Sequence, residues 1–179
     1  MTRTLNVLGL SGSLRAASHN AALLRAADEV APEGVNLSIY DYSEVPLYNS
    51  DVGELPAVEQ LKKAIGEADA VILSVAEYNY SISGVLKNAL DHASRPAYQS
   101  VFRDKPVGVF SAAASFVGGS RAQAHTKTIL LGMCSRVFPW PELLVGSAGT
   151  KFSDGRLEDE VTRTHLTAYM SGFARWLNK

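Results

Sequence analysis

A short segment near the N-terminus gathers hydroxyl side chains and one cation between an apolar run and a helical pattern. Residues 5–10 are apolar and typical of a buried strand, and from Ser18 onwards apolar residues recur at helical spacing. The polar candidates within this segment are Ser11, Ser13, Arg15, Ser18 and Asn20. Because the amide N–H groups and the positive dipole end of a helix start attract anions, we expect the segment to bind a phosphate group.

Three common motifs do not match this segment. A P-loop carries Lys-Ser or Lys-Thr after its glycines, whereas Leu14-Arg15 stands here. The spacing of Gly9 and Gly12 also breaks the dinucleotide fingerprint and the G-x-S-x-G nucleophile elbow. Arg15 is the one guaranteed cation, which favours a monophosphate over a triphosphate with its metal ion. The alternative is a Ser/Gly turn followed by a helix N-cap at Ser18, without a ligand.

A second polar loop, EYNYS at residues 77–81, follows the very apolar stretch at 70–76. Tyr78 and Tyr80, separated by an amide, suit the lining of a planar ligand. The rings could flank its face while backbone groups meet its polar edge. The alternative is that both tyrosines pack on a neighbouring helix or on another subunit.

Alternating strands and helices must position these loops. Strands are expected at 5–10, 35–39, 70–76, 107–113 and 142–145, and helices at about 18–33, 56–68, 84–95, 121–134 and 161–176. This order predicts an α/β fold in which helices cover both faces of a five-stranded parallel sheet. The second and fifth strands are the shortest or least apolar. If these two strands form the edges of the sheet, the strand order is 2-1-3-4-5, which is the flavodoxin-like arrangement.

The expected sheet also predicts where a ligand binds. In open parallel sheets, ligands lie beyond the carboxyl ends of the strands, at the point where the strand order reverses. Here that point lies between the first and third strands, at the loops 11–18 and 77–83, with 111–119 beside them. Topology and composition therefore select the same loops.

Bulk properties narrow the class of protein. The 179 residues can bury a sizeable core, so residues 1–179 are expected to form a single domain. A formal net charge of −1 gives no basic surface for nucleic acid. No apolar run reaches the ~20 residues of a membrane span, and residues 5–10 are too short for the core of a signal peptide. Because Cys134 is the single cysteine, no internal disulfide can form, and a cytoplasmic location is the default expectation. The Cys134 side chain is expected to be buried.

Five stretches together resemble the NAD(P)H-dependent FMN reductases, a flavodoxin-like family that includes chromate, quinone and azo-compound reductases. These are GSLRAASHN, PLYNSD, EYNYSISGVLKNALDHASR, GGSRAQ and FSDGRLEDE, and they span nearly the whole chain. Two positions depart from the family's pattern. Ala76 stands where the family usually has Pro, and Ala114-Ser115-Phe116 replaces a turn of the Ser-Pro-Gly or Thr-Gly type.

The resemblance implies a set of residues around a bound FMN. Ser11, Ser13, Arg15, Ser18 and Asn20 would hold the phosphate, with Leu14 among the cofactor-binding residues. The isoalloxazine ring would be bordered by Glu77, Tyr78, Asn79, Tyr80 and Ser81, and closed on its third side by Ser111 and the loop at Gly118.

The resemblance also implies an activity. NADPH or NADH would reduce the bound FMN, which would pass electrons to quinones, azo compounds, metal oxyanions or free flavin. The cofactor carries this chemistry, so no catalytic side chain and no metal site is expected. A homodimer or homotetramer is implied, with the loop around residues 46–49 at the interface. The alternatives are a flavodoxin-type electron carrier without its own NAD(P)H oxidation, and a phosphate-binding hydrolase or transferase on the same fold.

Overall fold

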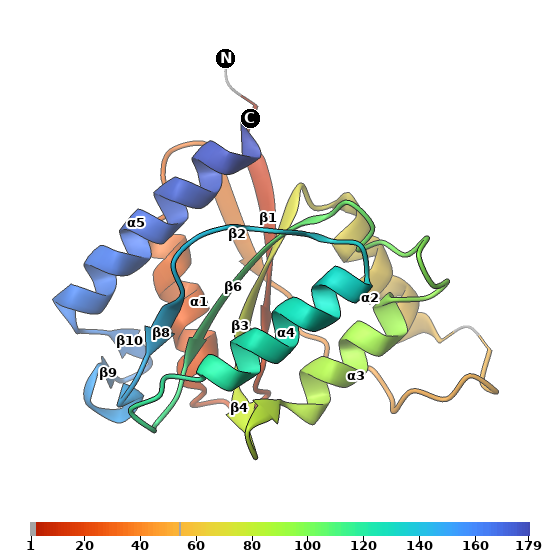
Figure 1. Ribbon diagram of the computed structural model, residues 1–179, viewed down its shortest axis with the longest axis horizontal. Coiled ribbons are helices and arrows are strands. Elements are labelled where there is room, and N and C mark those ends of the chain that lie inside the picture. Colours follow the sequence, from red (N-terminus) through yellow and green to blue (C-terminus); the bar gives the residue numbers. More distant parts are fainter. Residues whose placement is uncertain (1–2, 54) are drawn as a thin grey trace.

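The computed structural model describes residues 3–53 and 55–179, with a parallel sheet at its centre (Figure 1). The sheet contains β1 (Leu5–Ser11), β2 (Val35–Ile39), β3 (Ala70–Val75), β6 (Pro106–Ala112), β7 (Arg136–Val137) and β8 (Leu143–Val145). The strand order is β2-β1-β3-β6-β7, β8 also pairs with β6, and every pairing is parallel. The predicted order 2-1-3-4-5 is therefore confirmed.

The fifth position of the sheet holds two short strands in place of the predicted single one. β7 pairs with the start of β6, at Pro106 and Val107, and β8 pairs with its end. Pro139 and Pro141 lie between β7 and β8 and lack the backbone N–H that a ladder needs. The prediction of one strand at 142–145 therefore located β8 but missed β7.

Helices cover both faces of the sheet, as predicted (Figure 1). One face carries α1 (His19–Glu29) and α5 (Glu160–Leu177), and the other carries α2 (Pro56–Glu67), α3 (Gly84–Ala93) and α4 (Ser120–Gly132). Strand β1 contributes to both cores, because successive side chains point to opposite faces. Val7 packs with α1 and α5, while Leu8 and Leu10 pack with α2, α3 and α4.

Two local predictions are wrong. α1 ends at Glu29 and not near residue 33, because Pro32 has no N–H to donate and Gly34 adopts a φ of 83°. Cys134, expected to be buried, is exposed in the turn after α4, where its φ is 60°. None of the helices in the described part of the chain is both long and apolar enough to cross a membrane.

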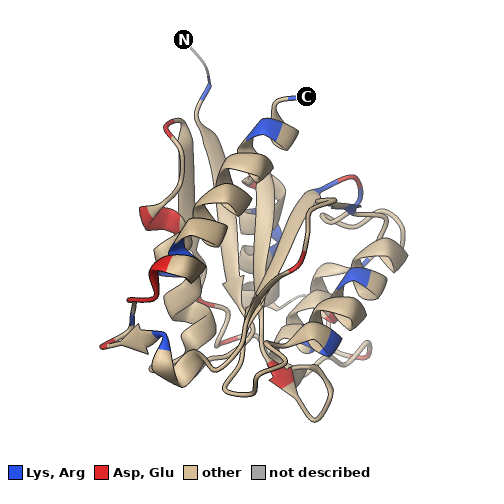
Figure 2. Ribbon diagram, turned by 60° about the vertical axis from the view of Figure 1, so that its left-hand side comes forward, with Lys and Arg blue, Asp and Glu red and all other residues tan. Residues whose placement is uncertain are grey.

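Short elements and charged side chains lie around this frame. Two small antiparallel hairpins are formed by β4 (Glu77–Tyr78) with β5 (Ser81–Ile82) and by β9 (Phe152–Ser153) with β10 (Arg156–Leu157), and a 3₁₀ turn, η1, spans Ala148–Thr150. The four longest strands, β1, β2, β3 and β6, contain no Lys, Arg, Asp or Glu. Charged residues lie instead on helices, loops and short strands (Figure 2).

Asn20, in the first turn of α1, joins that helix to the ends of two strands. Its buried side-chain Nδ2 donates to the carbonyl of Ala112 at 2.9 Å. Its Oδ1 accepts from the Ala112 N–H at 2.9 Å and from the Ser74 hydroxyl at 3.0 Å. Ser74 belongs to β3 and Ala112 to β6. One amide therefore fixes the start of α1 against the carboxyl ends of both strands.

We predict that Asn20→Ala lowers the free energy of unfolding by about 2–3 kcal/mol, because three buried hydrogen bonds, each worth about 1 kcal/mol, are lost. Urea unfolding of wild type and variant measures this. Asn36→Ala is the matched control, since Asn36 is exposed and, among the described residues, its side chain makes only a 3.4 Å bond to Asn6. A loss of equal size in the two variants would contradict the bracing role of Asn20.

Candidate functional site

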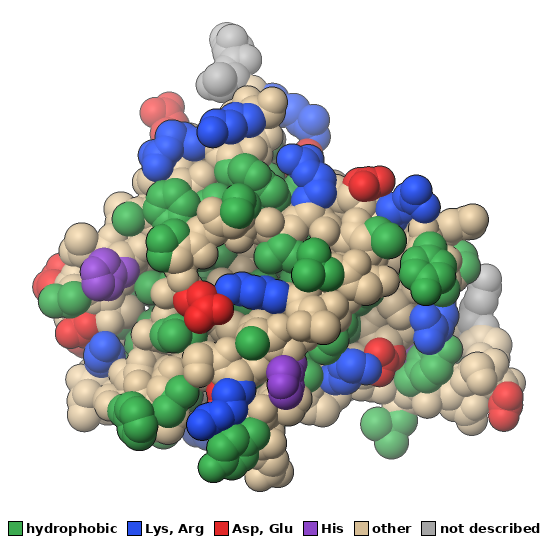
Figure 3. Space-filling view, viewed as in Figure 1, with side chains coloured by type: hydrophobic (Ala, Val, Ile, Leu, Met, Phe, Trp, Pro, Cys, Tyr) green, Lys and Arg blue, Asp and Glu red, His purple; other side chains and the backbone are tan. Residues whose placement is uncertain are grey.

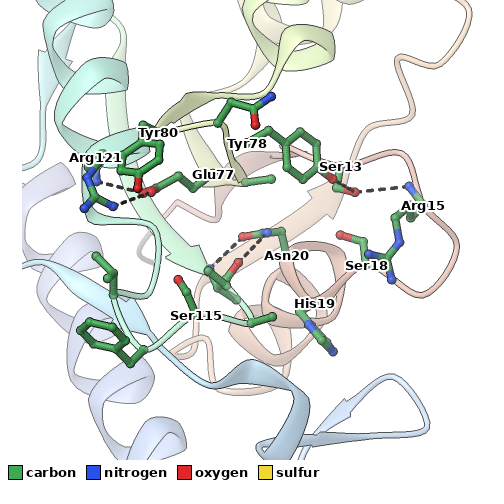
Figure 4. Close-up of a pocket in the computed structure, with 17 residues that line it drawn as sticks. Ser13, Arg15, Ser18, His19, Asn20, Glu77, Tyr78, Tyr80, Ser115 and Arg121 are labelled. Carbon is green, nitrogen blue, oxygen red and sulfur yellow. Dashed lines mark hydrogen bonds and ion pairs between the residues drawn. The ribbon is translucent and has the colours of Figure 1, made fainter.

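A cavity of about 610 Å³ opens at the carboxyl ends of β1, β3 and β6 (Figure 4). Its lining residues come from three segments, within residues 13–20, 76–80 and 112–117, together with Arg121 from α4. Open parallel sheets bind their ligands at this edge. The three loops selected by topology and composition thus meet around one cavity.

The loop after β1 is pressed against the end of β3. A Cβ atom at position 12 would lie 2.4 Å from the backbone N of Ala76, so only Gly12 permits this approach. The Ser11 hydroxyl serves the loop itself by donating to the Ser13 carbonyl at 3.0 Å. The Tyr42 hydroxyl donates to the Ser11 carbonyl, and burial raises the pKa of Tyr42, which keeps this hydroxyl protonated. Ser11 therefore supports the loop from behind and does not line the cavity.

Ser13 and Ser18 present hydroxyl groups to the cavity. Ser13 Oγ accepts from the Tyr78 hydroxyl at 3.1 Å, and Ser18 Oγ caps α1 by accepting from the Ala21 N–H at 3.2 Å. A hydroxyl has one hydrogen to donate and two lone pairs. Within residues 3–53 and 55–179 neither hydroxyl donates to a protein acceptor. The expected N-cap at Ser18 is present, and it leaves the hydroxyl hydrogen available to a ligand.

Arg15 lies beside these hydroxyls at one end of the cavity, while Glu77 and Arg121 lie at the other (Figure 4). The Arg15 side chain is exposed, and its guanidinium makes only a 3.5 Å contact with the carbonyl of Ala17. The first turn of α1 carries no acidic residue. This end of the cavity therefore combines a cation, two hydroxyl donors and the positive end of a helix.

The β4–β5 hairpin forms the second wall. Its two turn residues, Asn79 and Tyr80, have φ angles of 49° and 67°, which is the pattern of a type I′ turn. A left-handed backbone is uncommon for a bulky residue such as Tyr80, which is 69% exposed. Tyr78 also faces the cavity. Ser81 turns away, with its hydroxyl 2.9 Å from Nδ1 of His125 on α4.

Glu77 lines the cavity, but α4 engages its carboxylate. Oε2 accepts from the backbone N–H groups of Arg121 and Ala122 at 3.1 and 3.3 Å, and Oε1 pairs with the Arg121 guanidinium at 3.1 Å. The carboxylate thereby satisfies the positive end of α4. The same guanidinium lies 4.3 Å from the centre of the Tyr80 ring. Glu77 therefore holds α4 and the hairpin together.

Arg121 is a second cation at the cavity, which the sequence analysis missed when it counted Arg15 alone. Arg121 is the second residue of α4, and its position depends on where that helix starts relative to the sheet edge. The GGSR sequence at 118–121, which joins the third loop to the following helix, was the available signal, because it places a cation in the first turn of that helix.

The third wall is the segment between β6 and α4. Ala114, Ser115 and Phe116 belong to the lining. Ser111 lies beneath them, where its Oγ donates to the Gly118 carbonyl at 2.5 Å and accepts from Gln123 Nε2 at 2.8 Å. Ser111 and Gly118 thus support the wall from below, and the residues that depart from the family pattern form its surface.

The expected site residues divide into two groups. Those that line the cavity are Ser13, Arg15, Ser18, Asn20, Glu77, Tyr78, Asn79 and Tyr80. Those outside the lining are Ser11, Leu14, Ser81, Ser111 and Gly118. Lining residues that the sequence analysis did not name as site residues include His19, Ala76, Ala112, Ala113, Val117 and Arg121. Most of these unnamed residues are small and apolar, and such residues carry no chemical signal in a sequence.

Comparison with known proteins identifies the family. The model of the family described as NADPH-dependent FMN reductase matches residues 5–150. An NAD(P)H-dependent FMN reductase of Pseudomonas aeruginosa is 39% identical, with 100% of this chain and 98% of the relative covered. An NAD(P)H:quinone oxidoreductase of Solanum tuberosum is 40% identical over 93% of this chain and 89% of the relative.

A solved structure agrees with these sequence matches. FerB, a flavoenzyme NAD(P)H:(acceptor) oxidoreductase from Paracoccus denitrificans, is similar to this structure with a TM-score of 0.88 at 30% identity, and 97% of each chain is covered. The flavodoxin-like fold and the family resemblance are both confirmed. Family membership implies FMN as the cofactor and NADPH or NADH as the electron donor. The chain belongs to the NADPH-dependent FMN reductase family.

Proposed function

We propose that the cavity binds FMN with its phosphate at the loop after β1 and its ring system beside the β4–β5 hairpin. The observation that carries this proposal is the division of one cavity into two ends. Ser13, Arg15 and Ser18 offer hydrogen-bond donors and a charge at one end, and Tyr80 offers aromatic surface toward the other. Tyr78 lies between them, with its hydroxyl on Ser13. The site therefore fits a ligand with a phosphate group and a planar ring.

The chain's own residues have distinct tasks in this proposal. Ser13 and Ser18 donate their hydroxyl hydrogens to phosphate oxygens, and Arg15 adds a charge-assisted bond. The exposed guanidinium of Arg15 can close on the phosphate, because its contact with Ala17 is weak. Asn20 touches the cavity, yet its amide is engaged with Ala112 and Ser74. The task of Asn20 is to position the residues that hold the phosphate.

At the other end of the cavity the protein positions the ring system of FMN and shields it. Bound FMN would supply the redox chemistry, which is hydride acceptance and electron transfer. Backbone groups of residues 76–80 would meet the polar edge of its ring, and the hairpin would flank the ring. Glu77 anchors the hairpin to α4. No side chain is assigned the role of nucleophile or general base.

We assign quinones as the acceptor class, because the 40% identical relative from Solanum tuberosum is named an NAD(P)H:quinone oxidoreductase. The overall reaction is then quinone plus NAD(P)H plus one proton, giving hydroquinone and NAD(P)⁺. Azo compounds, metal oxyanions and free flavin are further candidates, each to be tested as an alternative acceptor.

The first test is a visible spectrum of the purified protein. We expect a yellow flavin spectrum that bleaches when NADPH is added without oxygen and recovers on addition of a quinone. A yellow protein that neither NADPH nor NADH bleaches would be an electron carrier that needs a partner reductase. A protein that stays colourless after incubation with FMN would favour the hydrolase or transferase alternative.

Replacing Arg15 by Ala should weaken FMN binding about tenfold or more, because a charge-assisted hydrogen bond worth about 1.5–3 kcal/mol is lost. The affinity for riboflavin, which lacks the phosphate, should not change. Quenching of flavin fluorescence measures both affinities. Arg175→Ala, at an exposed arginine of α5, is the matched control. Equal losses for FMN and riboflavin would show that Arg15 does not hold the phosphate.

We also propose that the chain forms a homodimer or homotetramer through the loop that precedes α2. Leu47 in this loop is 86% exposed. The loop is fixed on α3, because Asn88 Nδ2 donates to the Pro46 carbonyl at 2.8 Å and Asn88 Oδ1 accepts from the Tyr48 N–H at 2.8 Å. An apolar side chain on a rigid support is suited to contact a second copy.

Light scattering at micromolar concentration should give a mass about two or four times the 19.2 kDa of one chain. Leu47→Asp should shift this mass toward the monomer, since it places a charge in the contact. Val161→Asp, at an exposed valine on α5, is the control and should leave the mass unchanged. A monomeric mass for the wild type would refute the proposal.

A further inference from the structure

We propose that Phe116 is the aromatic wall against which a planar, uncharged acceptor of the quinone class binds, and that it sets the enzyme's preference among acceptors. This inference rests on the proposed function, in which the same cavity holds FMN, and deepens it by naming the residue that selects the acceptor. The first observation is exposure. Phe116 lines the cavity, yet the residue is 89% exposed to solvent.

The exposed ring stands on a rigid support. The carbonyl of Ser115 accepts from the Ser147 N–H at 3.0 Å, which ties the wall to the segment after β8. Gly146 packs directly on the backbone of Phe116, since a Cβ there would lie 2.4 Å from the Phe116 carbonyl oxygen. The backbone is therefore held in place by the sheet edge, while the ring projects outward. Fold stability does not explain an aromatic side chain in this position, because it buries almost no area.

A second exposed aromatic side chain lines the same cavity. Ser115, next to Phe116, lies across the cavity from the hairpin that carries Tyr78 and Tyr80 (Figure 4). Tyr80 is held by its left-handed backbone and by the Arg121 guanidinium beneath its ring. Figure 3 shows apolar side chains exposed over both the β4–β5 hairpin and the segment between β6 and α4. In the proposed function the FMN ring lies beside the hairpin, so a planar acceptor between that ring and Phe116 would be covered on both sides.

The charge distribution selects the kind of acceptor. The wall from Ala112 to Val117 consists of alanines, one serine, one phenylalanine and one valine, so it carries no charged side chain. The two cations of the cavity, Arg15 and Arg121, come from other segments. An uncharged ring gains contact with Phe116, whereas an anionic acceptor such as a metal oxyanion gains nothing from it. The wall is therefore matched to quinones.

Steady-state kinetics of the FMN-loaded enzyme test the inference with two acceptors. We expect Phe116→Ala to raise the KM for 1,4-naphthoquinone about tenfold relative to the KM for ferricyanide, as loss of one aromatic contact predicts. Phe116→Tyr keeps the ring and should restore the wild-type ratio. Phe116→Leu replaces Phe116→Ala in this test if the alanine variant does not fold. Val161→Ala, which removes exposed apolar surface outside the cavity, should leave the ratio unchanged.

A binding measurement gives a readout apart from turnover. Calorimetric titration of the FMN-loaded protein with 2-naphthol, a planar ring that is not a quinone, should show about tenfold weaker binding to Phe116→Ala. Equal KM ratios in wild type and Phe116→Ala would overturn the inference. A lower mass of the variant by light scattering would also overturn it, because it would mean that a second copy of the chain covers Phe116. If the wild type itself fails to hold FMN, or oxidises neither NADPH nor NADH, the proposed function fails, and the inference fails with it.

Discussion

The cavity is built by segments that follow three different strands, and the amide of Asn20 holds two of those strand ends at a fixed separation from α1. Its three hydrogen bonds reach β3 and β6 from the first turn of the helix. Gly12 complements this constraint, because it lets the loop after β1 approach the end of β3. These two contacts fix the relative positions of the groups around the cavity, which are the hydroxyls of Ser13 and Ser18 and the walls at 76–80 and 112–117.

Two helix N-termini lie near the cavity, and they differ in how their positive ends are satisfied. The start of α4 is capped from outside by the carboxylate of Glu77, which accepts from two backbone N–H groups and the Arg121 side chain. The start of α1 has only the neutral cap of Ser18 and no acidic residue in its first turn. An anion therefore gains more at α1 than at α4, because no carboxylate competes there. This difference favours the orientation proposed for FMN.

The sequence predicted the frame of the molecule better than the details of the cavity. Apolar runs and helical periodicity report burial, so they were sufficient for the strand order and for the three loops. These patterns contain no information on which hydroxyl faces a ligand. Ser11 and Ser13 look alike in the sequence, and only their contacts with Tyr42 and Tyr78 in the fold distinguish them. Arg121 and the capping role of Glu77 depend on contacts between segments that are distant in sequence. Cys134 was placed wrongly because its apolar surroundings in the sequence hid a turn.

The divided fifth position of the sheet has a consequence for how copies of this chain can associate. Pro139 and Pro141 leave the outer edge beyond β6 without a continuous row of N–H donors. A strand from another molecule would find no regular ladder to extend along this side. Addition of a strand from another copy is therefore disfavoured along this side of the sheet.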